Sequence, residues 1–133
     1  MAGSAMTFAY HEVGIVKKVV VDWTSDSATG AVSGTTKEIR GELLRGVTDP
    51  DGVAAPTDDY DIAITDEEGA NVLANCFDDL TDRDEANVEG VDFHLTDGAV
   101  ANGARPVVCD KLTIAVTAAG NSKQGRLVLY YRP

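Results

Sequence analysis

The fold class is decided by the stretch Lys111-Leu-Thr-Ile-Ala-Val-Thr-Ala-Ala-Gly-Asn-Ser-Lys-Gln-Gly-Arg-Leu-Val-Leu-Tyr-Tyr-Arg132. Apolar side chains occupy alternate positions near both of its ends, which is the period of a half-buried β-strand. The small and polar residues between the two runs predict a turn, so the stretch indicates a β-hairpin. The side chains expected to face the core are Leu112, Ile114, Val116, Leu127, Leu129 and Tyr131.

Further strand patterns lie upstream of this stretch. Residues 13–23 and 37–47 are rich in β-branched side chains, and we expect them to pair as antiparallel strands across a small-residue loop, 24–36. Residues 60–65 alternate between apolar and polar side chains. The sequences Asp49-Pro-Asp-Gly52 and Asp66-Glu-Glu-Gly69 predict turns on either side of them.

The remaining segments are less regular. Residues 91–95 alternate briefly, and 71–90 fit a short helical turn or an acidic loop. Because strand follows strand with no amphipathic helix between them, the predicted class is all-β, either an antiparallel β-sandwich or a small β-barrel with long small-residue loops. At 133 residues the chain has the length of one domain. We expect a flexible or extended N-terminal arm over 1–12 and a single β domain over 13–133.

Motifs that carry catalysis are missing from the sequence. A nucleophilic hydrolase needs a base beside its Ser or Cys, and neither His11 nor His94 lies in such a motif. No glycine-rich phosphate loop is present either. We therefore expect no enzyme activity and no cofactor. The aromatic residues Trp23, Tyr60, Tyr130 and Tyr131 are more typical of core packing than of a sugar-binding groove.

Metal ligands were sought among the acidic residues and the two cysteines. Asp82-Arg-Asp84 comes nearest to a calcium loop but departs from the EF-hand pattern, so no metal site is expected. Calcium bound at acidic turns around Asp49 and Asp58 stays open as an alternative. Cys76 and Cys109 have no CxxC spacing and no accompanying histidine, which predicts buried thiols and leaves a single disulfide as the alternative.

Charge is distributed unevenly along the chain. The net charge is −11, and residues 49–97 carry 16 acidic residues against Arg83 alone. Residues 1–48 balance five acidic against five basic residues, and 98–133 hold Asp110 against five basic residues. A protein that binds phosphate backbones needs clustered Lys and Arg, so nucleic acid is an unsuited partner. This uneven charge fits contacts between copies of the chain or docking on a basic surface. It fits equally well a role in keeping the protein soluble.

Membrane insertion is not expected from the sequence. No apolar run approaches the roughly 20 residues that span a bilayer. The N-terminal Met-Ala-Gly-Ser-Ala-Met lacks the basic start and apolar core of a secretory signal.

Three segments resemble the small structural proteins of tailed bacteriophages. They are residues 14–26, the stretch Thr57-Asp-Asp-Tyr-Asp-Ile-Ala-Ile-Thr-Asp-Glu-Glu-Gly-Ala-Asn-Val-Leu-Ala74, and residues 111–131. The resemblance covers over half of the chain and implies no catalytic residue. It implies a capsid cement or decoration protein on the virion exterior, assembled in the host cytoplasm, with the major capsid protein as partner and a homotrimer as its own assembly. A head-to-tail or tail component is the alternative within the family, and a carbohydrate- or calcium-binding β-sandwich is the alternative from another class.

Partner contacts are expected from two places. The N-terminal arm offers unpaired backbone groups and the side chains Thr7, Phe8, Tyr10, His11 and Glu12. The acidic stretch 78–89 matches no motif shared with the phage proteins, and we expect Asp82, Asp84 and Glu85 within it to carry partner specificity.

Overall fold

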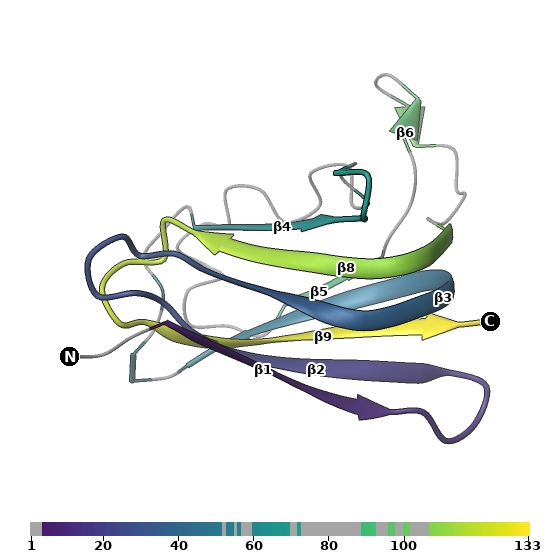
Figure 1. Cartoon of the computed structure of the whole chain (residues 1–133), viewed down its shortest axis with the longest axis horizontal. Coiled ribbons are helices and arrows are strands. Elements are labelled where there is room, and N and C mark those ends of the chain that lie inside the picture. Colours follow the sequence, from purple (N-terminus) through teal and green to yellow (C-terminus); the bar gives the residue numbers. More distant parts are fainter. Residues whose placement is uncertain are drawn as a thin grey trace.

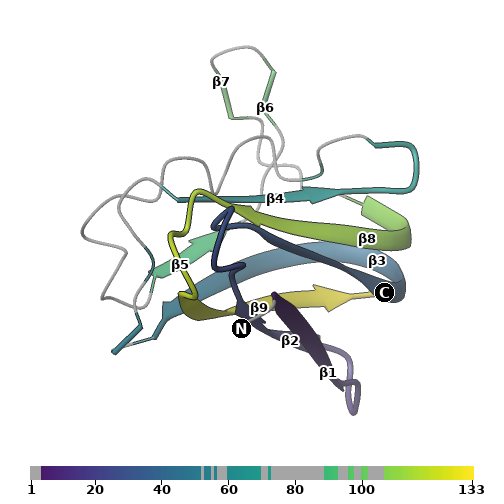
Figure 2. The same ribbon diagram turned by 60° about the vertical axis from the view of Figure 1, so that its left-hand side comes forward.

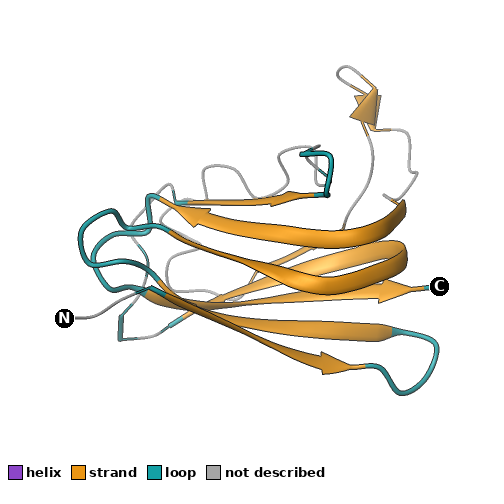
Figure 3. Cartoon of the chain, in the orientation of Figure 1, coloured by secondary structure: helices purple, strands orange, loops and turns teal. Residues whose placement is uncertain are grey.

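The computed structural model describes residues 4–51, 53–54, 56, 60–69, 72, 89–92, 96–97, 100–101 and 107–133. Every regular element in these residues is a β-strand, as Figure 3 shows, so the all-β prediction is confirmed. The main sheet contains β1 (Ala5–His11), β2 (Lys17–Thr24), β3 (Val32–Pro50), β4 (Asp61–Thr65), β5 (Glu89–Asp92), β8 (Val107–Thr117) and β9 (Gln124–Arg132). A separate two-stranded ribbon contains β6 (Thr96–Asp97) and β7 (Val100–Ala101).

The main sheet is antiparallel and runs in the order β1-β2-β9-β3-β8-β4 (Figure 1). The long strand β3 belongs to both of its halves, because Val32–Glu42 pair with β8 whereas Glu42–Pro50 pair with β9. The second part of β3 also pairs with β5 on its other side. The sheet therefore folds over at β3 into a sandwich-like arrangement, and it does not close into a barrel.

One hydrophobic cluster fills the space between the two halves. β2, β8 and β9 contribute alternate side chains to it, which explains the period-2 patterns of the sequence. All six core positions expected in the C-terminal stretch are buried. The cluster consists of Val19, Val21, Trp23, Val32, Ile39, Leu43, Tyr60, Ile62, Ile64, Val108, Leu112, Ile114, Val116, Ala119, Leu127, Leu129 and Tyr131.

β3 bends sharply at Gly41 and at the bulge that follows it. Gly41 has φ +131°, and a Cβ at this position would overlap the backbone carbonyl of Arg132. The register to β9 shifts just beyond it, between Leu43 and Arg45. Bulges of this kind bend a strand and let it pass from one sheet to the other.

The open side of the sandwich, between β1 and the first part of β3, is closed by side chains. Met6 and Phe8 pack so close to Gly34 that an added Cβ would lie 2.9 Å from Met6 Sδ. The Tyr10 hydroxyl accepts a hydrogen bond of 2.8 Å from the backbone N–H of Lys37. Met6, Phe8 and Tyr10 thereby cover one margin of the core.

The expected C-terminal hairpin is wrong in its pairing. β8 and β9 follow each other in the chain, but β3 lies between them and pairs with both. The turn 118–123 instead crosses between the halves of the sheet and is held by loop 25–31. Ala119 N–H donates to Gly30 O at 3.0 Å, and Ser25 Oγ donates to Gly120 O at 2.6 Å. Hydrophobic alternation identified both strands but carries no information about which strand separates them.

One further expectation for the N-terminal half differs from the structure. Segment 13–23 does not pair with 37–47, because β9 lies between β2 and β3. Residues 5–11, within the expected arm, are extended and pair with β2 along their whole length. The first strand of the chain is therefore β1, and β2 begins at Lys17.

Smaller expectations have mixed outcomes. Strand 60–65 and the turn at Asp66–Gly69 are confirmed, the latter by a 3.0 Å hydrogen bond from Gly69 N–H to Asp66 O. Cys109 is exposed on β8 and free, so its expected burial is wrong: its position is an outward one in the alternation of that strand. Cys76 lies outside the described residues, as does most of 71–90.

Candidate interaction surface

The β1–β2 hairpin ends in an exposed apolar loop, Val13-Gly-Ile-Val16, which we call the hairpin tip. Val13 is 99% exposed, Ile15 76% and Val16 54%. Single apolar side chains on a surface are ordinary, but three within four residues form a contiguous patch. The loop that carries the tip projects at one end of the sheet in both Figure 1 and Figure 2.

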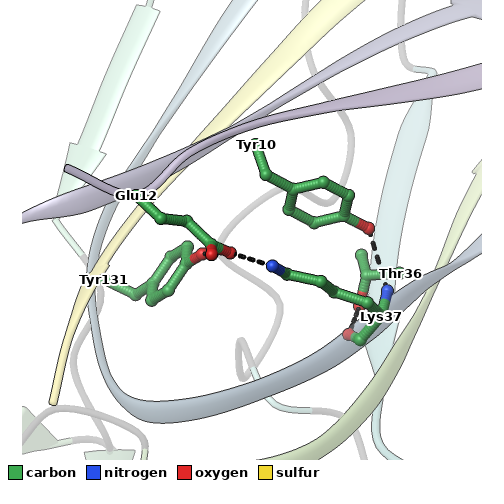
Figure 4. A network of polar contacts seen from close by, with 5 residues as sticks. All are labelled: Tyr10, Glu12, Thr36, Lys37 and Tyr131. Atoms are coloured by element: carbon green, nitrogen blue, oxygen red, sulfur yellow. Dashed lines mark hydrogen bonds and ion pairs between the residues drawn. The ribbon is translucent and has the colours of Figure 1, made fainter.

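Polar contacts hold the base of this loop against the sheet. Figure 4 shows the Glu12 carboxylate between the Lys37 ammonium group, with which it forms an ion pair, and the hydroxyl of Tyr131. That hydroxyl donates to Glu12 Oε1 at 3.1 Å. Lys37 Nζ also lies 4.6 Å from the ring centroid of Tyr10. Tyr10, Glu12, Lys37 and Tyr131, the polar strap, thus tie three strands together directly behind the tip.

Ionisation within the polar strap follows from these contacts. The hydrogen bond from Lys37 holds the pKa of Glu12 below its ordinary value, although partial desolvation acts in the opposite direction. Burial raises the pKa of Tyr131 far above that of a free tyrosine, and the adjacent Glu12 carboxylate raises it further. At neutral pH Glu12 is therefore charged and Tyr131 is its hydroxyl donor.

The outer face of β1, β2, β9 and β3 carries side chains in rows, because directly paired residues share a face. The row nearest the tip contains His11, Lys18, Tyr130 and Arg45. Its Arg45 guanidinium lies 5.4 Å from the centroid of the Tyr130 ring. The next row is apolar and consists of Ala9, Val20, Val128 and Val47. The row that contains His11 therefore carries two basic side chains, Lys18 and Arg45, and no acidic one.

A shallow hollow of about 510 Å³ lies at the opposite end of the same strands. Asp22 and Arg126 in its lining form an ion pair of 2.7 Å, with about half of each side chain exposed. Asp51 accepts hydrogen bonds from the backbone N–H groups of Val53 and Ala54, which lower its pKa. Asp22, Arg126 and Asp51 therefore all have structural partners within the protein.

The aromatic residues named for the carbohydrate alternative are mostly buried, whereas the calcium candidates Asp58, Asp82 and Asp84 lie outside the described residues. Trp23, Tyr60 and Tyr131 are buried, and the Arg45 guanidinium lies over the half-buried ring of Tyr130. Within the described part of the chain, no group of three or more His, Cys, Asp or Glu side chains is placed to hold a metal ion. No helix in that part is long and apolar enough to cross a membrane.

The five contact residues expected in the arm lie on or beside β1. Thr7 and His11 point outward and are exposed, whereas Phe8 and Tyr10 point inward and are half-buried. Glu12 belongs to the polar strap. Asp82, Asp84 and Glu85 lie outside the described residues.

Sequence reasoning missed the hairpin tip, because Val13, Ile15 and Val16 were assigned to a strand. The available signal was Gly14, which has φ +95° and marks a turn within an otherwise β-branched run.

No protein-family model matches the chain. No curated protein matches it either. Among solved structures it is similar to the C-terminal CBM6 of LamC, a marine laminarinase from Zobellia galactanivorans, with a TM-score of 0.43, 11% identity, and coverage of 97% of this chain and 90% of that one. FlhE gives a TM-score of 0.35 and 8% identity over 99% of this chain and 100% of that one. The enzymatically active domain of tailspike protein 4 of bacteriophage CBA120 gives a TM-score of 0.39 and 9% identity. The match covers 99% of this chain and 20% of that one. All three likenesses are weak and concern β-rich architecture alone.

Proposed function

We propose that this chain is a decoration protein that binds the outside of a tailed-phage major capsid shell and stabilises it. The hairpin tip is the observation that carries the proposal, together with the resemblance of residues 14–26, 57–74 and 111–131 to small phage structural proteins. In this proposal the hairpin tip is the part of the protein that contacts the capsid shell. The protein is then a virion component on the capsid exterior, assembled in the host cytoplasm.

The energetics of the tip favour an apolar contact. Burial of a Val or Ile side chain contributes about 1.5–3 kcal/mol relative to full exposure. Val13 and Ile15 together therefore offer at least about 3 kcal/mol that the free chain does not use. The polar strap fixes the loop against β3 and β9, so little conformational entropy is lost when a partner covers it.

Co-sedimentation with expanded capsids that lack the protein tests the proposal. The intact chain should pellet with the shells, and the double variant Val13→Ser, Ile15→Ser should bind about a hundredfold more weakly, which corresponds to the loss of about 3 kcal/mol. Val53→Ser is the matched control, because Val53 is 98% exposed and lies far from the tip in the chain.

The outcomes separate the alternatives. Failure of the intact chain to bind shells contradicts the proposal, and capture by purified tails or connectors in the same assay would favour the head-to-tail alternative. Equal binding by the intact chain and the tip variant would leave the decoration function standing and remove the tip from it.

A further inference from the structure

We infer that two copies of this chain join edge to edge through β1, as an antiparallel strand pair that continues the sheet across a two-fold axis. The inference stands independently of the proposed function, because it concerns the edge of the sheet and not the hairpin tip. Three features of the described residues lead to it: an unprotected edge, a protected opposite edge, and the distribution of charge.

β1 is an edge strand without the features that normally prevent edge association. It has seven residues, Ala-Met-Thr-Phe-Ala-Tyr-His, and pairs with β2 without a register shift. It contains no proline, lysine or acidic residue. No described residue outside β2 makes a backbone–backbone hydrogen bond to it, since the Lys37 N–H reaches β1 only through the Tyr10 hydroxyl. No other labelled element lies beyond it in Figure 1 or Figure 2. Natural edges of this length are usually interrupted, charged or covered.

The opposite edge, β4, is protected in these ways. It is only five residues long and begins with Asp61. The backbone N–H of Val72 donates to Ile64 O at 2.9 Å, which occupies an acceptor of the strand. On the neighbouring β8, the N–H of Lys111 is bound by the Glu67 carboxylate at 2.9 Å. The contrast between these two edges makes β1 the less protected of the two ends of the strand order.

Charge favours a second copy of the chain as the occupant. Two molecules with a net charge of −11 repel each other, but β1 itself contains no acidic residue. Asp49 and Asp51 lie near one end of β1, where they line a hollow together with Ala5 and Thr7. Residues 1–48, which contain β1 and β2, balance five acidic and five basic residues. The side chains of β1 therefore bring no like-charged pair together when two copies meet at this edge.

The side chains of β1 fit a pair centred on Phe8. Antiparallel pairing with matched faces requires residue numbers that sum to an even value, and a two-fold axis at Phe8 meets this requirement. Phe8 then lies opposite Phe8 of the second copy, and Met6 opposite Tyr10, all on the inner face. These three side chains are only half-buried in the single chain, so the pair covers their remaining apolar surface. On the outer face Thr7 lies opposite Ala9.

Charge substitutions on the outer face test this register, with sedimentation equilibrium as the measurement. The intact chain should have twice the 14.0 kDa chain mass. The double variant Thr7→Lys, Ala9→Lys puts two like-charged pairs across the axis and should raise the dimer Kd about tenfold or more. The double variant Thr7→Lys, Ala9→Glu puts opposite charges there and should dimerise at least ten times more tightly than the dilysine variant. Circular dichroism confirms that both variants fold.

Each outcome decides the inference. A dimer with this ranking of the variants supports it. A monomer, a trimer, or a dimer that is indifferent to these substitutions overturns it, and a trimer would favour the assembly implied by the phage resemblance. Capsid binding by the folded dilysine variant would show that the proposed function survives without the β1 pair, so the two ideas can fail separately.

Discussion

At the scale of single residues, the Thr36 side chain makes hydrogen bonds at a point where the pairing of β3 with β8 is irregular. The pairing of β3 with β8 shifts between Thr35 and Glu38, which leaves the backbone there without regular ladder bonds. Thr36 is 2% exposed, and its Oγ1 accepts a 3.0 Å hydrogen bond from the N–H of Leu112 while donating at 2.7 Å to Lys37 O. The hydroxyl thus provides a hydrogen-bond partner for the Leu112 N–H and for the Lys37 carbonyl, which the irregular pairing leaves without a partner on the neighbouring strand.

Replacement of this hydroxyl by a methyl group should destabilise the fold. In Thr36→Val the buried N–H of Leu112 loses its acceptor, which costs about 1–3 kcal/mol. Thr36→Ser keeps the oxygen and loses only one methyl group, so its cost should be about 1 kcal/mol. Urea unfolding measures both values. A valine variant as stable as the serine variant would show that water reaches the Leu112 amide.

The sequence could not have revealed this role of Thr36. Ser33-Gly-Thr-Thr36 consists of small and polar residues, which predict a loop over 24–36, yet β3 begins at Val32. Gly34 is required there because Met6 and Phe8 approach it across the open side of the sandwich. Contacts between residues this far apart in the chain override local propensity.

At the scale of elements, the polar strap links the β1–β2 hairpin to β3 and β9. The lowered pKa of Glu12 means that its charged form is stabilised on folding, so this contribution is present above the ordinary glutamate pKa and is lost as the pH falls through the folded value. Glu12→Gln should therefore be less stable than the intact chain above about pH 5, and the two unfolding free energies should converge in acid.

Urea midpoints measured across this pH range test the prediction for the strap. Glu68→Gln removes an equal charge from the exposed turn after β4, and it controls for the change in net charge. A constant difference between the intact chain and Glu12→Gln at every pH would mean that Glu12 acts by packing and not by its charge.

Strand existence was largely predictable from sequence, whereas strand partners were not. The alternation Leu112, Ile114, Val116 is confirmed because a half-buried strand imposes its period on the sequence itself. The insertion of β3 between β8 and β9 depends on the corner at Gly41, which is one of 13 glycines and has no distinguishing neighbours in the sequence. Val13 and Ile15 were misassigned for a related reason: β-branched residues exposed in a loop have the same sequence pattern as residues buried in a core.

At the scale of the whole molecule, charge opposes the folded state as well as close approach of copies. A net charge of −11 on 133 residues, with 16 acidic residues in one segment, produces self-repulsion that folding concentrates. The Debye length falls from about 30 Å at 0.01 M to about 10 Å at 0.1 M ionic strength, so salt screens most of this repulsion.

The melting temperature at neutral pH should therefore rise with ionic strength. If screening recovers about 1 kcal/mol, the rise between about 0.01 M and about 0.3 M sodium chloride is about 3–5 °C for a chain of this length.

Calcium at about 100 µM is too dilute to screen and should leave the melting temperature unchanged, since a shift requires a site that binds the ion in the folded state. Differential scanning calorimetry with each salt measures both effects. A large calcium shift would reveal a site among the acidic residues and favour the calcium-binding alternative over the decoration protein, whereas a flat sodium chloride series would show that the acidic residues are already spaced widely enough not to repel.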